Sequence, residues 1–151
     1  MRIGPITEGD YEAALPLIAE YQRFYGVATP DLERNRTFFR RFLAPSDDGM
    51  LLGAWEGELL VGFTCLYWTY SSITAREIVL LADLLVQESA RGRGIGERLI
   101  EAAVAVARER GAGHIEWITH VDNRRAQRLY DRIPSAHRDT WLGYEIPLEG
   151  S

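Results

Sequence analysis

Apolar residues recur at helical spacing in the first third of the chain. A Thr-Glu-Gly-Asp sequence opens a stretch that predicts a helix over about residues 7–25, with a kink or an early break at Pro16. Thr29 and Pro30, as N-cap and first-turn proline, predict a second helix over residues 31–43. The chain is therefore expected to begin with two helices.

The middle of the chain changes to patterns typical of strands. Residues 50–55 and 59–70 flank a short Glu-Gly-Glu turn, which predicts an antiparallel hairpin. A nearly continuous apolar run at residues 78–87 predicts a strand that is covered on both faces. A helical pattern follows at residues 94–110, and Gly111 predicts its end.

The last third predicts a strand at residues 114–121, a helix at residues 123–132 capped by Asp122, and a final strand at residues 140–148. The two strands that flank the long helix are expected to be parallel. The order of elements predicts an α+β sandwich, with about four helices around a mixed, mostly antiparallel sheet.

Composition narrows the class of protein. The 151 residues fit one domain over residues 1–151, and 46% hydrophobic with 26% charged residues is a normal globular mix. No apolar run approaches the about 20 residues of a membrane span. A net charge of −5 argues against a nucleic-acid partner. The single cysteine, Cys65, excludes an internal disulfide and a cysteine-rich metal site, so we expect a cytoplasmic protein without a metal.

The sequence Ser-Ala-Arg-Gly-Arg-Gly-Ile-Gly lies where the apolar strand passes into the long helix. The first N–H groups of a helix have no internal partner and attract anions. Gly92, Gly94 and Gly96 let the backbone approach a bulky anion, while Arg91 and Arg93 add positive charge. The stretch therefore predicts a phosphate or pyrophosphate cradle, and a flexible surface turn is the alternative.

Two familiar phosphate-binding motifs do not fit this stretch. A dinucleotide fold needs Gly-x-Gly-x-x-Gly, whereas the spacing here is Gly-x-Gly-x-Gly. A P-loop needs Gly-Lys-Ser/Thr, which the chain lacks. The stretch is therefore expected to form a phosphate cradle of another type.

The segment from Arg91 to Gly96 resembles the Arg/Gln-x-x-Gly-x-Gly/Ala signature of the GCN5-related N-acetyltransferase (GNAT) family. The segment Val-Asp-Asn-Arg-Arg-Ala-Gln-Arg-Leu-Tyr, which starts at Val121, resembles the second motif of that family. The order of elements agrees as well, so the resemblance covers nearly the whole chain. It implies a GNAT-type three-layer sandwich whose sheet splays beside the acetyl-CoA strand.

The resemblance also implies acetyl-CoA as co-substrate. The glycine loop would wrap its pyrophosphate, and the strand before the loop would bind its pantetheine arm through backbone amides, one of which would stabilise the oxyanion. The positions that match the family are Leu84, Leu85, Val86, Arg91, Gly92, Arg93, Gly94, Ile95, Gly96, Glu97, Asn123, Ala126 and Tyr130.

Two residues are candidate catalytic groups. Tyr130 matches the family tyrosine that protonates the leaving thiolate, and its alternative role is that of a core aromatic. Asp83 is a candidate base, or a structural residue, because strand alternation directs it away from the face of Ala82 unless the strand bulges. Some polyamine acetyltransferases have glutamate where this chain has Ala82, which argues against polyamine specificity.

The implied reaction is direct acetyl transfer to a primary amine of a small molecule. A protein lysine or N-terminus is an alternative acceptor, and a silent acyl-CoA-binding module is an alternative function. Trp68, Tyr70, Glu77 and His120 are further candidates for the acceptor side. The family's Gly-Phe pair is missing after Tyr130, and a homodimer is expected because dimers are common in the family.

Overall fold

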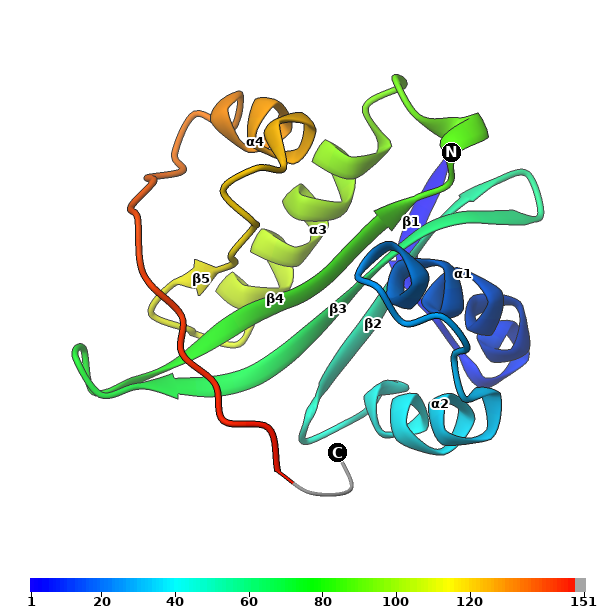
Figure 1. Cartoon of the computed structure of the whole chain (residues 1–151). Helices are drawn as coiled ribbons and strands as arrows, with labels where there is room; N and C mark the ends of the chain where they lie inside the picture. The colour runs from blue at the N-terminus through cyan, green and yellow to red at the C-terminus, as the bar shows by residue number, and fades with distance from the viewer. Residues whose placement is uncertain (149–151) are drawn as a thin grey trace.

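The computed structural model describes residues 1–148 as a five-stranded sheet with helices on both faces (Figure 1). The strands are β1 (Arg2–Pro5), β2 (Gly49–Glu56), β3 (Leu59–Ser71), β4 (Arg76–Val86) and β5 (Ile115–Glu116), and the helices are α1 (Tyr11–Phe24), α2 (Leu32–Phe39), α3 (Ile95–Glu109) and α4 (Arg124–Asp131). The strand order is β1-β2-β3-β4-β5. All neighbours are antiparallel except β4 and β5, which are parallel. The predicted α+β class and the mostly antiparallel sheet are confirmed.

Each face of the sheet has its own hydrophobic core. Side chains of α1 and α2 pack on one face, together with Phe63 and Cys65 of β3. Side chains of α3 pack on the other face, where Leu99 meets Leu66 and Val79. Because successive strand residues point to opposite faces, Cys65 and Leu66 enter different cores. The molecule is thus the three-layer sandwich that the sequence predicts.

Helix α1 passes through Pro16 without ending, so the predicted early break is wrong. Proline costs a helix one hydrogen bond, but the buried face that includes Leu15, Leu17 and Ile18 keeps the helix on the sheet. Helix α2 is capped by Asp31, whose side chain accepts a hydrogen bond from the Arg34 amide, and not by the predicted Thr29.

The first strand, β1, was not predicted from the sequence. It pairs antiparallel with β2, and the following residue continues the contact through a 2.9 Å hydrogen bond from the Ile6 amide to the Leu51 carbonyl. A four-residue strand that contains Gly4 and Pro5 has no clear alternation of apolar residues. Long-range pairing with β2 makes it a strand.

The end of the chain differs most from the prediction. Strand β5 covers only Ile115–Glu116 of the predicted residues 114–121, and residues 140–148 form no strand. A strand needs a neighbour for its backbone groups, and in the described part of the chain β5 has one only on its β4 side. Helix α4 is capped by Asn123, whose side chain accepts from the Ala126 amide, rather than by Asp122. None of the helices within residues 1–148 is long and apolar enough to cross a membrane.

Candidate active site

Strand β4 contains a bulge at Ala82. Asp83 lies opposite Cys65 on β3, whereas the next β3 residue, Leu66, lies opposite Leu81. Ala82 is therefore an extra residue without a partner of its own. Such a residue changes the phase of side-chain alternation along the strand. The sequence left undecided whether this strand bulges, and the structure shows that it does.

The phase change decides which face Asp83 occupies. Before the bulge, Val79 and Leu81 belong to the core under α3, and after it Leu85 belongs to the core under α1. Asp83 is two residues from Leu85 and shares its face. The carboxyl group is therefore placed on the side of the sheet that α1 and α2 cover, near Tyr21 of α1.

The environment of Asp83 makes its carboxyl group a weaker acid than an exposed aspartate. Burial raises the pKa of Asp83 to about 6, and the hydrogen bond with Tyr21 opposes that rise. The Tyr21 hydroxyl also donates to the Ala82 carbonyl oxygen at 3.3 Å. A carboxylate with a pKa near the working pH can take up and release a proton. Asp83 is therefore a candidate general base.

A row of tyrosines leads from Asp83 toward α4. The rings of Tyr21, on α1, and of Tyr25, the C-cap residue of that helix, lie 4.9 Å apart. Tyr25 is also close enough to Tyr130 on α4 to influence its ionisation. Tyr130 packs edge-on against Trp117, with ring centroids 5.5 Å apart. Each candidate catalytic residue is thus influenced by one tyrosine of this pair.

Burial keeps the phenol of Tyr130 protonated. It raises the pKa of Tyr130 to about 12, with a smaller contribution from Tyr25. Tyr21 and Tyr25 were not predicted from the sequence, although their spacing of four residues places them on one face of a helix. That spacing alone is common in packed helices and gives no indication of chemistry.

One edge of β4 is open beyond the bulge. Pairing with β5 ends at Leu80 and Glu116. The Gln87 amide donates to the Val61 carbonyl at 2.8 Å, toward β3. Since backbone groups alternate in direction along a strand, those of Leu84 and Val86 point away from β3, into the gap between β4 and β5. The predicted splay of the sheet is confirmed.

Leu84, Leu85 and Val86, the three strand residues predicted to bind the cofactor, therefore differ in which backbone groups are available to a ligand. The backbone of Leu85 points toward β3, and its side chain lies in the α1 core. The Val86 carbonyl accepts a 2.9 Å hydrogen bond from the Arg91 guanidinium. The amide of Val86 and both backbone groups of Leu84 remain directed at the open edge. An extended amide-containing ligand could pair with them.

The glycine loop follows directly after this edge. Gly92 and Gly94 have φ values of +80° and +76°, which side-chain-bearing residues rarely adopt, and a Cβ at either position would meet no atom within 4 Å. Within residues 1–148, the backbone N–H groups of residues 92–97 donate to no protein acceptor. The loop offers several free N–H groups at the start of α3, as an anion site requires.

Gly96 serves a different purpose from the other two glycines. A Cβ on Gly96 would lie 3.0 Å from the Cδ2 atom of Leu129, so its absence lets α4 pack against α3. Ile95 is buried and anchors the helix, while Glu97 is partly exposed in its first turn. Asn123 and Ala126 form the cap of α4, with the Ala126 amide already donating to the Asn123 side chain.

The two arginines of the loop are held by protein groups. Arg91 is bonded to the Val86 carbonyl, as described above. Arg93 pairs with Glu56 at 2.8 Å and donates to the Ser89 carbonyl at 2.9 Å. Both contacts fix the loop to the ends of strands. The positive charge of Arg93 is therefore partly neutralised within the protein.

The remaining acceptor candidates lie elsewhere. Trp68 donates to the Ser46 carbonyl and stacks on Arg110, which also pairs with Glu77 at 2.7 Å. His120 is exposed, and its ring accepts from the Asp122 amide. None of these contacts involves Asp83.

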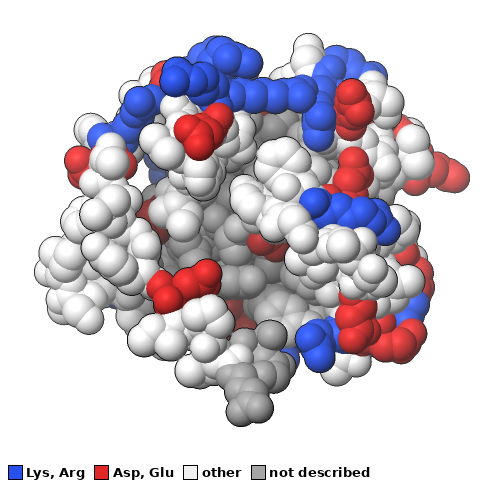
Figure 2. Space-filling view, in the orientation of Figure 1, with Lys and Arg blue, Asp and Glu red and all other residues white. Residues whose placement is uncertain are grey.

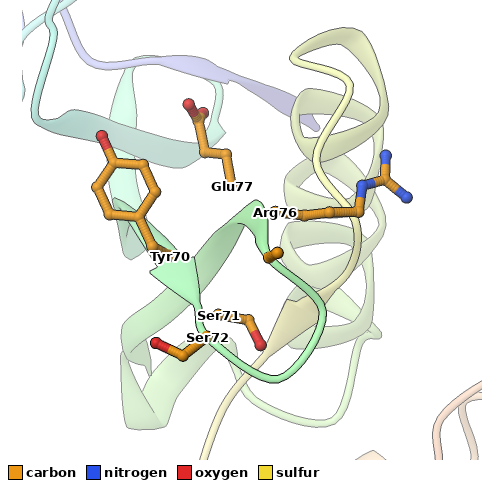
Figure 3. A pocket seen from close by; sticks show the side chains of 6 residues that line it. Tyr70, Ser71, Ser72, Arg76 and Glu77 are labelled. Atoms are coloured by element: carbon orange, nitrogen blue, oxygen red, sulfur yellow. The ribbon is translucent and has the colours of Figure 1, made fainter.

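Tyr70 belongs to a shallow pocket at the turn between β3 and β4 (Figure 3). Arg76 extends from the same turn toward α3 and donates to the Gly111 carbonyl at 3.2 Å. Another depression, at the end of β4, is lined by Glu20, Gln87, Glu88 and Ser89. Carboxylates in that depression do not suit a phosphate.

The surface is hollowed between the α4 side and the α1 side of the molecule (Figure 2). Basic side chains gather along the edge of the molecule above α4 and the start of α3, and acidic atoms lie within the hollow (Figure 2). Within residues 1–148, no group of three or more His, Cys, Asp or Glu is placed to hold a metal ion. The charges favour an anionic ligand at the loop end of the hollow and a cationic one inside it.

Comparisons with known proteins agree with this geometry. The family model described as acetyltransferase (GNAT) family matches residues 15–133. An uncharacterized N-acetyltransferase of Bacillus subtilis, YhfO, is 36% identical over 87% of this chain and 87% of its own. The D-amino-acid N-acetyltransferase HPA3 of Saccharomyces cerevisiae is 36% identical over 85% of this chain and 80% of its own.

A solved structure described as a probable acetyltransferase covers 100% of both chains. It has a TM-score of 0.84 and 29% sequence identity to this chain. The likeness extends over the sheet and the helices on both of its faces.

Proposed function

Because the chain belongs to the acetyltransferase (GNAT) family and is an acetyl-transferring enzyme, we propose that it moves acetyl from acetyl-CoA directly to a primary amine of a small molecule. One observation carries this proposal: the open edge of β4, the free amides of the glycine loop, Asp83 and Tyr130 all lie around one split in the sheet. The proposed site thereby combines a surface for acetyl-CoA with one group that can accept a proton, Asp83, and one that can donate a proton, Tyr130.

The residues present fit acetyl-CoA, which supplies an acetyl group activated as a thioester. The free amides of residues 92–97 suit a pyrophosphate, since Gly92 and Gly94 leave space above the loop. Leu84 and Val86 offer backbone groups to the amides of a pantetheine arm. Asn123, Ala126 and Tyr130 belong to the same proposed site from the α4 side.

Asp83 would accept a proton from the incoming amine. An alkyl amine has a pKa of about 10.4, so it is almost fully protonated at neutral pH and cannot attack. A carboxyl group with a pKa of about 6 is mostly ionised at pH 7 and can take that proton. The neutral nitrogen then attacks the thioester carbon, and the resulting tetrahedral intermediate collapses as the C–S bond breaks.

Tyr130 would return a proton to the departing sulfur. A free thiol has a pKa of about 8.5, so a phenol whose pKa is raised to about 12 is protonated before the reaction but gives up its proton only if the phenolate is reprotonated at once. The second proton that the nitrogen must lose on forming the amide supplies that reprotonation. No nucleophile of the protein is required. The chain's one cysteine, Cys65, is buried, and burial raises the pKa of its thiol.

The acceptor is proposed to be a small amine such as an amino acid. The yeast relative is named for D-amino acids, which supports a small acceptor. The partly buried carboxylate of Asp83 suits a cationic amine. We also propose that the enzyme is a homodimer.

An acceptor screen that follows thiol release tests this function. D- and L-amino acids, diamines and lysine peptides are offered with acetyl-CoA to wild type, Tyr130→Phe and the control Tyr70→Phe, whose side chain is 79% exposed at the β3–β4 turn. We expect transfer to a small amine, with kcat lowered about 100-fold or more in Tyr130→Phe only. Acetyl-CoA binding with no transfer indicates a silent module, and transfer confined to peptides indicates a protein acetyltransferase.

A further inference from the structure

Tyr67 of β3 and Asp83 of β4 share the face of the sheet that α1 and α2 cover. Asp83 lies opposite Cys65, and Tyr67 follows Cys65 by two residues and packs on the same core. Diagonal neighbours on adjacent strands lie within reach of an aromatic side chain. Burial, and after it the charge of Asp83, raises the pKa of the half-buried Tyr67 phenol. Tyr67 is thus a close neighbour of the candidate base.

Two phenylalanines continue this surface from Tyr67 toward solvent. The ring of Phe42 stacks on that of Tyr67, with centroids 5.2 Å apart, and Phe38 packs edge-on against Phe42 at 5.7 Å. Phe42 is buried, whereas Phe38, near the end of α2, is 37% exposed. The three rings therefore form a continuous surface from the neighbourhood of Asp83 to the outside of the molecule.

Arg41 lies at the outer end of this aromatic surface. Its guanidinium carbon is 4.6 Å from the centroid of the Phe38 ring, and its Nε atom donates to the Phe38 carbonyl oxygen at 3.0 Å. These two contacts hold the planar guanidinium in place. Burial raises the pKa of the Tyr67 phenol, and the positive charge of Arg41 opposes that rise. Arg41 and Asp83 thus act on Tyr67 with opposite charges.

Arg41 differs from the neighbouring arginines in having no acidic partner. Arg34, Arg36 and Arg40 each form an ion pair with a carboxylate. Within residues 1–148, Arg41 forms none, and its Nη N–H groups donate to no protein acceptor. The planar set of N–H groups of a guanidinium matches the two oxygens of a carboxylate. Arg41 therefore offers a positive charge that is fixed in place but not neutralised.

We propose that Arg41 binds the carboxylate of an amino-acid acceptor whose reacting amine lies at Asp83, so that this arginine selects amino acids over simple amines. The inference rests on the proposed function and adds a specificity residue to it. An amino acid carries one positive and one negative charge, and Asp83 and Arg41 supply the two opposite charges at one aromatic surface. A simple amine has no group for the guanidinium, so it lacks this charge-assisted contact.

Acceptors that differ only in the carboxyl group test the role of Arg41. D- and L-alanine and D- and L-lysine are each compared with their carboxamides, as a ratio of kcat/KM values, in wild type, Arg41→Gln and the control Arg34→Gln. The Arg34 side chain is 74% exposed on α2. We expect the ratio of acid to carboxamide to fall about 10-fold or more in Arg41→Gln, through KM, and to stay unchanged in Arg34→Gln. Because the ratio is compared between variants, the different amine pKa values of acid and carboxamide cancel.

A binding measurement separates this inference from the proposed function. The same acids and carboxamides are titrated calorimetrically into each variant in the presence of coenzyme A, where no acetyl can move. We expect wild type and Arg34→Gln to prefer the acid about 10-fold, and Arg41→Gln to show no such preference. Circular dichroism verifies that the variants are folded.

The outcomes are distinct for the two ideas. No preference in wild type, an equal preference in Arg41→Gln, or the same loss in Arg34→Gln overturns the role of Arg41, whether or not acetyl is transferred. A preference that depends on Arg41 without any acetyl transfer supports the carboxylate site and counts against the proposed function alone.

Discussion

The hydroxyl of Tyr21 donates a 3.3 Å hydrogen bond to the backbone carbonyl of Ala82, the extra residue of the β4 bulge. The same hydroxyl lies close enough to the Asp83 carboxyl group to lower the pKa of that group. Helix α1 therefore supports both the irregular backbone and the candidate base. A single hydroxyl connects the shape of the strand to the protonation of Asp83.

Replacing that hydroxyl should change the pH dependence of the reaction. In Tyr21→Phe, burial of Asp83 persists while the opposing hydrogen bond is lost, so the pKa of Asp83 rises above about 6. The active carboxylate then forms only at higher pH. We expect the acid limb of kcat/KM to move upward by about one pH unit, measured between pH 5 and pH 9.

Tyr67→Phe is the matched control for this shift. The Tyr67 ring lies close enough to Asp83 to be influenced by its charge, but no hydrogen bond from its hydroxyl to Asp83 is present in the described structure. The acid limb of the kcat/KM profile of Tyr67→Phe should stay at the wild-type pH. Equal shifts in both variants would contradict a specific role for the Tyr21 hydroxyl.

Asp83 should also destabilise the fold at neutral pH. The ordinary pKa of an aspartate side chain, 3.8, rises to about 6 for Asp83 in the folded protein, so the carboxyl group favours folding below pH 4 and loses that contribution as pH rises through 6. Two pKa units correspond to about 3 kcal/mol. We expect Asp83→Asn to be more stable than wild type by about 2–3 kcal/mol at pH 8 and not at pH 4. Urea unfolding at both pH values measures the difference, and an equal gain at both would exclude the ionisation of Asp83 as its cause.

The sequence predicted the long elements well because their signals are local. The apolar run of β4 and the periodic pattern of α3 determine those elements within a few residues. The four residues of β1 and the short β5 depend on distant partners, which no local pattern reveals. Residues 140–148 carry a strand pattern, but a strand also needs a neighbour, and no strand of the described residues pairs with them.

For the candidate site, the glycine loop was recognisable because its chemistry lies in consecutive residues. The bulge at Ala82 was only one of two possibilities, since it arises from the register between β3 and β4. Tyr21 and Tyr25 were missed because they reach the site from a helix about 60 residues before it. The different role of Gly96 also required knowledge of where Leu129 lies.

Gly94 allows a test of the phosphate cradle by charge alone. Asp and Asn have nearly the same shape and both tolerate a positive φ better than other side chains. Gly94→Asp would place a negative charge beside the free amides of the loop, whereas Gly94→Asn would not. We expect Gly94→Asp to weaken acetyl-CoA binding by about 10-fold or more relative to Gly94→Asn, a coupling of over about 1.4 kcal/mol. Calorimetric titration measures both, and equal affinities would place the pyrophosphate elsewhere.

The open edge of β4 can be tested by removing one backbone donor. The Leu84 amide points away from β3, so Leu84→Pro removes an N–H that the sheet does not use. Leu84→Ala is the control for the lost side chain, because it keeps that N–H. We expect acetyl-CoA to bind about 5- to 10-fold more weakly to Leu84→Pro than to Leu84→Ala, as the loss of one hydrogen bond implies. Thermal unfolding checks that both variants are folded, and equal affinities for two folded variants would show that the Leu84 amide takes no part in binding.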